Sequence, residues 1–306
     1  MRTLQKAIFL LACFCVCIWV IGRIASDRWY WSQWLLWIPT LGIIGTLFFS
    51  CGFSAFAKNK KHTTILGFLA VFFTVWFLCI ENRVFSLSRG SGDFKIVGWT
   101  MSHAKAEVSK ESANIIVQLD ADITILTHGW HVRGEPAIKD WLGEKNKRLI
   151  SGPFTLLTTL RPLEVRTLVA SDGMYISMYR VDARAALGKE LVIYAVDLPF
   201  TSKESRKAIV QRTKRFLRQM DLPDPDLVVG DFNMTRNSNS MRRMFPTLKD
   251  AWDASGVGWS SSFHRAFPLF HIDHMLLGSD LHPVEYALID PEFGRHCIQV
   301  LELAKE

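Results

Sequence analysis

Acidic residues are almost absent from the first 80 residues of this 306-residue chain. Asp27 is the single acidic residue there, against seven lysines and arginines, which gives residues 1–80 a net charge of +6. Residues 81–306 hold 29 basic and 28 acidic residues, so the whole-chain charge of +7 arises from the first part. The positive charge lies beside apolar stretches and not on a basic face, so it does not indicate a nucleic-acid-binding domain.

Cysteine is scarce outside those apolar stretches. Five of the six cysteines lie within them, and Cys297 stands alone in the rest of the chain. The C-terminal part therefore has no internal disulfide and no cysteine-based metal site. Internal repeats and low-complexity segments are absent as well, which excludes repeat architectures.

Three long apolar runs cover residues 7–22, 34–56 and 63–80. A membrane-spanning helix needs about 20 mostly apolar residues, so we expect three transmembrane helices, with Pro39 kinking the second helix without breaking it. Five aromatic residues at the start of the second run resemble an interfacial belt: Trp29, Tyr30, Trp31, Trp34 and Trp37. Buried core helices of a soluble protein are the first alternative. A cleaved signal peptide over the first run is the second, although no small-residue cleavage site follows it.

The basic residues that flank these runs predict an orientation. Five of them fall on one side of the membrane: Arg2, Lys6, Lys58, Lys60 and Lys61. Arg23 and Arg28 fall on the other side, offset by Asp27. The positive-inside rule then places the N-terminus in the cytoplasm and, after three crossings, the C-terminal domain outside it. We expect a multi-pass protein of the cell membrane, with the lipid bilayer as its partner.

The rest of the chain divides into a polar linker over residues 81–93 and an α/β domain over residues 94–306. Apolar, β-branched segments predict strands over 94–99, 123–127, 154–160, 164–170, 174–181, 191–196, 227–230, 272–276, 284–289 and 297–303. Helical spacing predicts a helix over 104–119. A second helix is expected to start at a capping box formed by Thr201 and Glu204 and to run to about Met220.

The segment over residues 226–238, DLVVGDFNMTRNS, places polar groups directly after a buried strand. Asp231 and Asn233 follow Gly230, and side chains at the carboxyl end of a buried strand point into a shared crevice. Asp231 could accept a proton from water and Asn233 could stabilise an oxyanion. Alternatively, the two residues only form a turn.

This segment resembles the GDFN motif of the endonuclease/exonuclease/phosphatase superfamily, the DNase-I-like hydrolases. The stretch FHIDHMLL, about forty residues later, resembles the superfamily's IDxIL strand. The order of predicted strands also resembles its bacterial members that carry short N-terminal membrane helices. The resemblance implies a four-layer α/β/β/α sandwich that cleaves phosphate esters with a divalent metal, usually Mg²⁺.

Four functional positions depart from the family pattern. Thr100 stands where the family has an Asn that helps to hold the metal, and His128 stands where it has the principal metal-binding Glu. Asp197 replaces a phosphate-contacting His, and Arg295 replaces the Asp of a Ser-Asp-His motif. Three of these changes, at Thr100, His128 and Arg295, remove oxygen ligands that suit Mg²⁺. Arg295 and Asp197 remain candidates for contacting substrate.

Four residues match the family's catalytic positions. By that resemblance, Asp231 activates the attacking water, Asn233 steadies the transition state, and Asp273 pairs with His296. A carboxylate beside an imidazole favours its charged form, so we expect these two side chains within about 2.6–3.2 Å. His274 follows Asp273 and is a candidate for lining the pocket.

Three alternatives for the chemistry stay open. In the first, the domain is a non-catalytic member of the family. In the second, it is a hydrolase that uses Mn²⁺ or Zn²⁺ through residues such as His128. In the third, Arg295 replaces the metal. The ligand class is a phosphate ester, which includes phospholipid head groups. Duplex nucleic acid is not favoured, because a net charge near +1 gives no basic groove.

Overall fold

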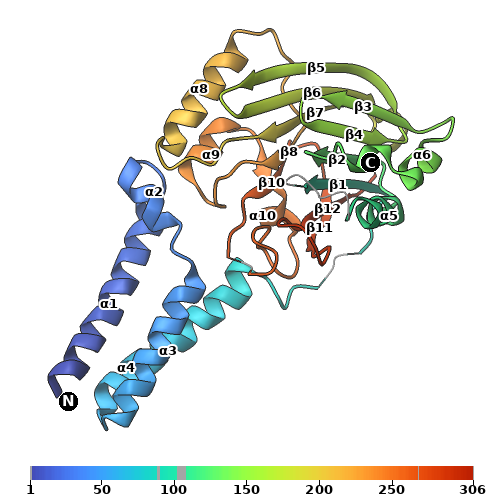
Figure 1. The fold of residues 1–306 in the computed structure, drawn as a ribbon. Helices are drawn as coiled ribbons and strands as arrows, with labels where there is room; N and C mark the ends of the chain where they lie inside the picture. Colours follow the sequence, from blue (N-terminus) through green and yellow to red (C-terminus); the bar gives the residue numbers. More distant parts are fainter. Residues whose placement is uncertain (1, 88–89, 102–107, 268, 306) are drawn as a thin grey trace.

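The computed structural model describes residues 2–87, 90–101, 108–267 and 269–305. It has a slender helical part and a larger α/β part, with the N-terminus at the far end of the helices (Figure 1). The helical part consists of α1 (Arg2–Ala25), α2 (Tyr30–Leu36), α3 (Thr40–Phe56), α4 (Lys60–Trp76) and a π-helical turn, η1 (Phe77–Glu81).

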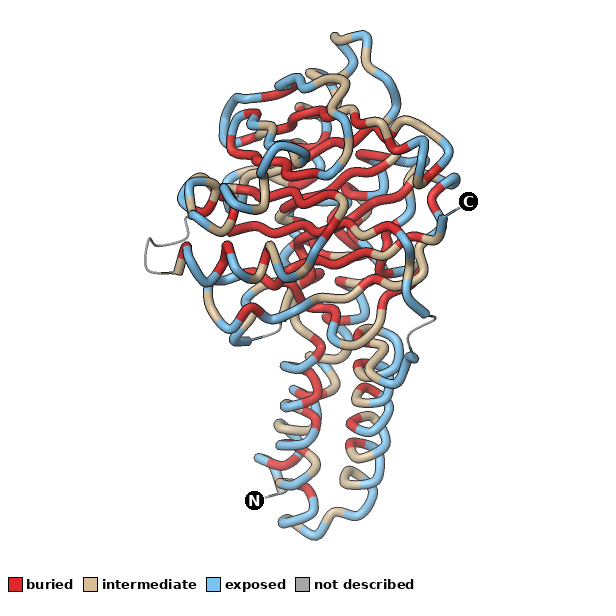
Figure 2. The backbone as a smooth tube through the Cα atoms, turned by 90° about the vertical axis from the view of Figure 1, so that its right-hand side faces the viewer, coloured by how far each residue is buried: buried red, intermediate tan, exposed pale blue. Residues whose placement is uncertain are grey.

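The helical part has a narrow seam of buried residues, and most of its remaining residues are exposed or half-buried (Figure 2). Many of the exposed ones are large and apolar. Two helices, Thr3–Ala25 and Lys60–Glu81, are long and apolar enough to cross a membrane, or up to three if α2 and α3 form one span. Only 17% and 22% of their most apolar windows are buried inside the molecule. Helices of a soluble core would bury far more of such surface, so this exposure favours a lipid environment.

Pro39 breaks the second apolar run instead of merely kinking it. α2 and α3 are separate helices bent by 63° from each other, and Pro39 is the extended residue that precedes α3. Proline lacks an N–H and clashes with the preceding turn, so the chain leaves the helical conformation here. Four of the five expected belt aromatics are exposed at this end of the helices: Trp29, Tyr30, Trp31 and Trp34.

Two six-stranded sheets form the α/β part. The first contains β1 (Phe94–Thr100), β2 (Ile123–Thr127), β3 (Lys147–Ser151), β4 (Phe154–Thr158), β11 (Pro283–Ile289) and β12 (Ile298–Leu303), in the order β11-β12-β1-β2-β4-β3. The second contains β5 (Arg161–Ser171), β6 (Met174–Asp182), β7 (Glu190–Asp197), β8 (Leu227–Asp231), β9 (Lys249–Asp250) and β10 (Asp273–Leu277), in the order β5-β6-β7-β8-β10-β9. The pairs β1–β2 and β7–β8 are parallel, and the other pairs are antiparallel.

Three hydrophobic cores stack these sheets into four layers. The central core joins the inner faces of both sheets and contains Ile96, Ile125, Ile193 and Val229. A second core packs α5 (Ser109–Leu119) and α6 (Pro136–Leu142) on the first sheet. A third packs α8 (Arg206–Arg218) and α9 (Asn239–Met244) on the second. The described residues thus form the predicted α/β/β/α sandwich, with short helices α7 (Arg184–Leu187), η3 (Val132–Gly134) and α10 (Ala251–Ser255) at its edges.

The helix after β7 does not begin at the predicted capping box. Ser205 caps α8 by accepting a hydrogen bond from the N–H of Ala208. Thr201 instead accepts one from the N–H of Lys203, and Glu204 pairs with Arg212 at 2.9 Å. The capping-box prediction was therefore wrong, because Ser205, which lies closer to the helix than Thr201, makes the capping hydrogen bond. The start of the helix predicted over residues 104–119 lies outside the described residues, and α5 begins at Ser109.

The helical part is fastened to the sandwich by buried polar contacts. Asp27, which is 1% exposed, accepts a hydrogen bond from the N–H of Ser240 at 3.0 Å. Asn82 accepts hydrogen bonds from the N–H and the hydroxyl of Ser260 at 3.0 and 3.1 Å. Arg83 donates to the carbonyl of Trp252 at 2.9 Å. The segment expected to act as a linker over residues 81–93 is therefore docked on the sandwich at its beginning.

Candidate functional site

Three aspartates meet at one edge of the second sheet because of its strand register. Asp197 ends β7 and lies opposite Asp231, the last residue of the parallel strand β8. Asp273 begins the antiparallel strand β10 and is the register partner of Asp231 on its other side. Three adjacent strands thus present three carboxyl groups at the same end of the sheet.

Asp273 and His296 form the predicted pair. The His296 Nδ1 lies 2.8 Å from the Asp273 Oδ2, and the side chains are 5% and 1% exposed. The Thr100 hydroxyl donates to the Asp273 Oδ1 at 2.6 Å, and the Ser262 hydroxyl accepts from the Asp273 N–H at 3.0 Å. The carboxylate is therefore held by His296 and Thr100 while Ser262 holds the backbone of Asp273, which fixes the orientation of the imidazole.

The surroundings shift the pKa values of Asp231 and Asp273 in opposite directions. Burial and the neighbouring Asp273 charge raise the pKa of Asp231 well above its usual range, against the opposing influence of His296. Burial also disfavours the charged form of Asp273, but the charge and hydrogen bond of His296 outweigh it and lower the pKa of Asp273. Burial opposes the imidazolium of His296, yet Asp273 raises the pKa of His296 overall. The surroundings thus disfavour the charged form of Asp231, whereas Asp273 and His296 each favour the charged form of the other.

His128 and Asp197 form a second pair across the two sheets. The His128 Nε2 lies 2.9 Å from the Asp197 Oδ2, with side chains 19% and 13% exposed. His128 directly follows β2 and has a left-handed backbone, φ 59°, which is uncommon outside glycine and asparagine. Its N–H donates to the carbonyl of Pro153 at 2.8 Å, which holds this conformation. The residues that sequence analysis matched to the family's Glu and His therefore contact each other.

Gly230 and Asn233 shape the turn that follows β8. Gly230 has φ 142°, and a Cβ there would lie 1.9 Å from the Val196 carbonyl oxygen, so the parallel pairing of β7 and β8 requires glycine. Asn233 has φ 49°, its N–H donates to the Asp231 Oδ1 at 2.8 Å, and its side-chain amide donates to the Leu198 carbonyl at 2.8 Å. These bonds form the turn that was the alternative interpretation of this motif. Asn233 also lines the cleft.

A cleft of about 850 Å³ opens beside these groups. Six of the predicted residues line it: Thr100, His128, Asp197, Asp231, Asn233 and Arg295. Arg295 is exposed at this wall, whereas Asp273 and His296 are buried beneath it. The structure brings together all the predicted site residues but one.

His274 is the exception. Successive side chains of a strand point to opposite faces, so His274 faces away from the side that carries Asp273. It is fully buried, with its Nδ1 2.8 Å from the Asp250 Oδ2 and its Nε2 2.9 Å from the Met234 carbonyl. It therefore does not line the cleft, and its proposed contact with substrate is corrected. Sequence analysis also missed Ser262, because a loop serine eleven residues before its partner carries no recognisable signal.

Two groups of three side chains among the described residues could hold a metal ion. In each of them, Asp231–Asp273–His296 and Asp250–His271–His274, the ligand atoms lie within 4.8 Å of one another. The first group borders the cleft, and in it Asp273 already contacts His296 and Thr100. The group offers one imidazole nitrogen and two carboxylate oxygens, which could hold a divalent metal ion.

No family model and no curated protein matches the sequence. Solved structures do match the fold. The mannosyl-6-phosphatase Bt3783 from Bacteroides thetaiotaomicron has a TM-score of 0.54 at 14% identity, over 69% of this chain and all of that one. An endonuclease/exonuclease/phosphatase family protein from Leptotrichia buccalis has a TM-score of 0.52 at 12% identity, over 69% of this chain and 99% of that one. Humanized D. rerio TDP2 has a TM-score of 0.50 at 15% identity, over 69% of this chain and 99% of that one. These similarities show that the chain has the DNase-I-like fold.

Proposed function

We propose that this chain is a membrane-anchored member of the endonuclease/exonuclease/phosphatase superfamily whose cleft binds a phosphate ester without magnesium-dependent hydrolysis. The observation that carries the proposal is the state of the three carboxyls at the end of the second sheet. Asp197 is paired with His128, Asp273 is paired with His296, and burial and the charge of Asp273 raise the pKa of Asp231. Mg²⁺ would have to displace two histidines and overcome this bias at Asp231 to gain three carboxylate ligands.

The same arrangement supports binding of a phosphate group. A protonated Asp231 is a hydrogen-bond donor, and a guanidinium such as that of Arg295 can bind two phosphate oxygens in a fork. Arg295 stands at an acidic position of the family pattern, and this change of sign favours an anion over a cation.

A second candidate function is phosphate-ester hydrolysis with Mn²⁺ or Zn²⁺. The specific observation in its favour is the Asp231–Asp273–His296 group, whose ligand atoms lie within 4.8 Å. A metal there would displace the proton of Asp231 and lower the pKa of a bound water, which Arg295 cannot do. The two candidates differ in whether turnover appears with any added metal.

The anchor also restricts the ligands that the cleft can meet. The apolar helices support a membrane location, with the sandwich outside the cytoplasm by the distribution of basic residues. A phosphate ester at the membrane surface, such as a phospholipid head group or a small diffusible ester, fits this location. Duplex nucleic acid remains the less favoured ligand, because the basic and acidic residues after residue 80 nearly balance.

The test uses the full chain in a neutral detergent. Hydrolysis of p-nitrophenyl phosphate and bis(p-nitrophenyl) phosphate is measured with Mg²⁺, Mn²⁺, Zn²⁺ or EDTA, and binding of both compounds is measured by calorimetry in EDTA. We expect binding in EDTA and no turnover with Mg²⁺. Arg295→Gln should weaken binding about tenfold, whereas Arg166→Gln, an exposed arginine outside the cleft, should not. Turnover with Mg²⁺ would contradict the proposal, and turnover with Mn²⁺ or Zn²⁺ alone would establish the second candidate.

A further inference from the structure

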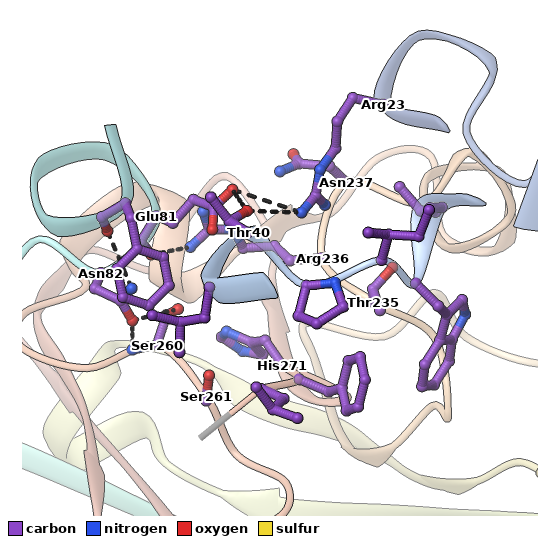
Figure 3. Close-up of a pocket in the computed structure, with 18 residues that line it drawn as sticks. Arg23, Thr40, Glu81, Asn82, Thr235, Arg236, Asn237, Ser260, Ser261 and His271 are labelled. Carbon is purple, nitrogen blue, oxygen red and sulfur yellow. Dashed lines mark hydrogen bonds and ion pairs between the residues drawn. The ribbon is translucent and has the colours of Figure 1, made fainter. Parts of the chain in front are cut away.

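A second pocket lies between the helical part and the sandwich, away from the cleft. The ends of α1, α2 and η1 and the beginning of α3 form one side, and the loops around Arg236, Ser260 and His271 form the other (Figure 3). It has no lining residue in common with the cleft. A ligand bound in this pocket would therefore contact the helical part and the sandwich together, and it would not touch the residues that line the cleft.

Two arginines from the two parts of the chain converge on this pocket. The Arg23 guanidinium donates to the Thr40 hydroxyl at 3.2 Å and lies 3.6 Å from Glu81. Arg236, with a side chain 12% exposed, donates to the Glu81 carbonyl at 3.2 Å and lies 3.8 Å from the largely exposed Asp253. Glu81 is the single carboxylate among the described lining residues, and Asp253 lies just outside the lining, so each arginine has one carboxylate within 4 Å.

Buried polar atoms in the same pocket lack a partner among the described residues. The Thr235 hydroxyl and both ring nitrogens of His271 have no hydrogen-bond partner there, although these residues are only 8% and 7% exposed. Such orphaned groups are costly, which indicates that something else satisfies them.

The beginning of α3 adds to this preference for an anion. The 17-residue helix starts at Thr40, which lines the pocket, and no side chain caps it. Uncapped N–H groups and the helix dipole attract negative charge at this end. Two guanidinium groups, unpartnered buried polar atoms and an uncapped helix start therefore offer hydrogen bonds to an anion with several acceptor oxygens, such as a phosphate diester.

The surroundings of the pocket indicate where that phosphate comes from. Its remaining wall contains Leu36, Leu41 and Phe77, which continue into the apolar helices. The exposed aromatic residues of the belt, among them Trp34, lie in and beside α2, at the depth where aromatic rings meet lipid head groups. A ligand with a phosphate diester and apolar chains matches both walls.

We propose that this pocket binds the phosphate group of a phospholipid from the leaflet beside the sandwich, through Arg23, Arg236 and Thr235. This inference rests on the proposed membrane anchor but not on the proposed role of the cleft. A bound lipid would join α1, α3 and the sandwich at one point and so hold the domain at a fixed height above the membrane.

The test measures thermal unfolding of the full chain in dodecyl maltoside with three added probes. Dioctanoyl phosphatidylglycerol carries both the phosphate and the acyl chains. Dioctanoylglycerol carries the acyl chains alone, and inorganic phosphate supplies the phosphate without acyl chains. We expect the phospholipid to raise the melting temperature in a saturable way, and the other two to have little effect at the same concentrations. Equal stabilisation by inorganic phosphate, or by dioctanoylglycerol, would overturn the assignment to a phospholipid.

Variants separate binding from folding. Arg236→Gln should weaken the apparent affinity for the phospholipid about tenfold or more, because it removes a charged donor. Thr235→Val, which is nearly isosteric, should weaken it several-fold while leaving the lipid-free melting temperature within a few degrees. Arg243→Gln, at an exposed arginine outside the pocket, should change neither. Unchanged affinity in both pocket variants would overturn the proposal.

Alkaline carbonate extraction keeps the two proposals distinguishable. A chain that carbonate releases from membranes would refute the anchor. A chain that stays in the membrane fraction but shows no phospholipid-dependent stabilisation would refute the lipid site alone.

Discussion

The buried pair of Asp273 and His296 should be a major source of stability, and Asp273→Asn tests it. The two side chains are 1% and 5% exposed and 2.8 Å apart. Breaking a buried pair by removing one charge costs about 3–5 kcal/mol. Because asparagine can still accept the hydrogen bond from Thr100, we expect the lower end, about 3 kcal/mol. At about 2–4 °C per kcal/mol, that corresponds to a fall of roughly 6–12 °C in melting temperature.

The pH dependence of this loss follows from the directions of the two pKa shifts. The pKa of Asp273 is lowered, so its contribution is present above its unfolded value near ~4 and is lost as the pH falls through the folded value. The pKa of His296 is raised, so its contribution is complete below ~6.5 and is lost as the pH rises through the folded value. The difference between wild type and Asp273→Asn should therefore be largest between about pH 4 and 6.5 and should shrink on both sides.

The assay is thermal unfolding of the full chain in neutral detergent between about pH 3.5 and 9. Asp290→Asn is the matched control, because it removes a carboxylate from a pair with Arg265 at 3.3 Å whose Asp290 side chain is 49% exposed. Exposed pairs contribute at most about 1 kcal/mol, so the control should shift the melting temperature little. A loss in Asp273→Asn that is no larger than in the control, or that does not vary with pH, would refute the reasoning.

Three further predictions concern the turn at the site, the start of α8 and the membrane topology. Gly230→Ala should cost more than about 4 kcal/mol or prevent folding, since its Cβ would lie 1.9 Å from the Val196 oxygen; near-normal unfolding would show that β7 and β8 are paired differently. Ser205→Ala should destabilise the chain by about 1 kcal/mol and Thr201→Ala by less than about 0.5 kcal/mol in denaturant titrations, and the reverse order would restore the capping box. A reporter that works only in the cytoplasm, fused after Glu306, should be silent, and full signal would reverse the proposed orientation.

Strand patterns predicted the sheet positions well, because buried strands are continuous apolar runs that end at polar residues. Asp231 could therefore be placed at the end of an apolar strand, whereas the role of Asp273 and its pairing with His296 followed from the family resemblance. The contact of His128 with Asp197 could not be predicted, since it depends on how two separate sheets pack. β3 was missed because it is an edge strand with exposed Lys147 and Arg148.

Local signals failed where two positions could serve equally well or where tertiary contacts decided the outcome. Thr201 and Ser205 both carry hydroxyls before α8, and only the structure shows which of them caps the helix. Pro39 breaks its run because the chain turns there to place α2 against the sandwich, where Gln33 accepts a hydrogen bond from the N–H of Arg206 at 3.1 Å. The lining of the second pocket comes from distant segments, so no sequence pattern could have indicated it.

Calorimetric titration of Mg²⁺ into the full chain tests the central claim most directly, which is that the fold is retained while its magnesium site is not. Wild type is compared with the double reversion His128→Glu and Arg295→Asp, which restores a carboxylate at each position. We expect weak or undetectable binding to wild type and at least about tenfold tighter binding to the double reversion, because each change replaces a nitrogen group by an oxygen ligand. Tight binding to wild type that the double reversion leaves unchanged would contradict the account and show that the metal site lies elsewhere.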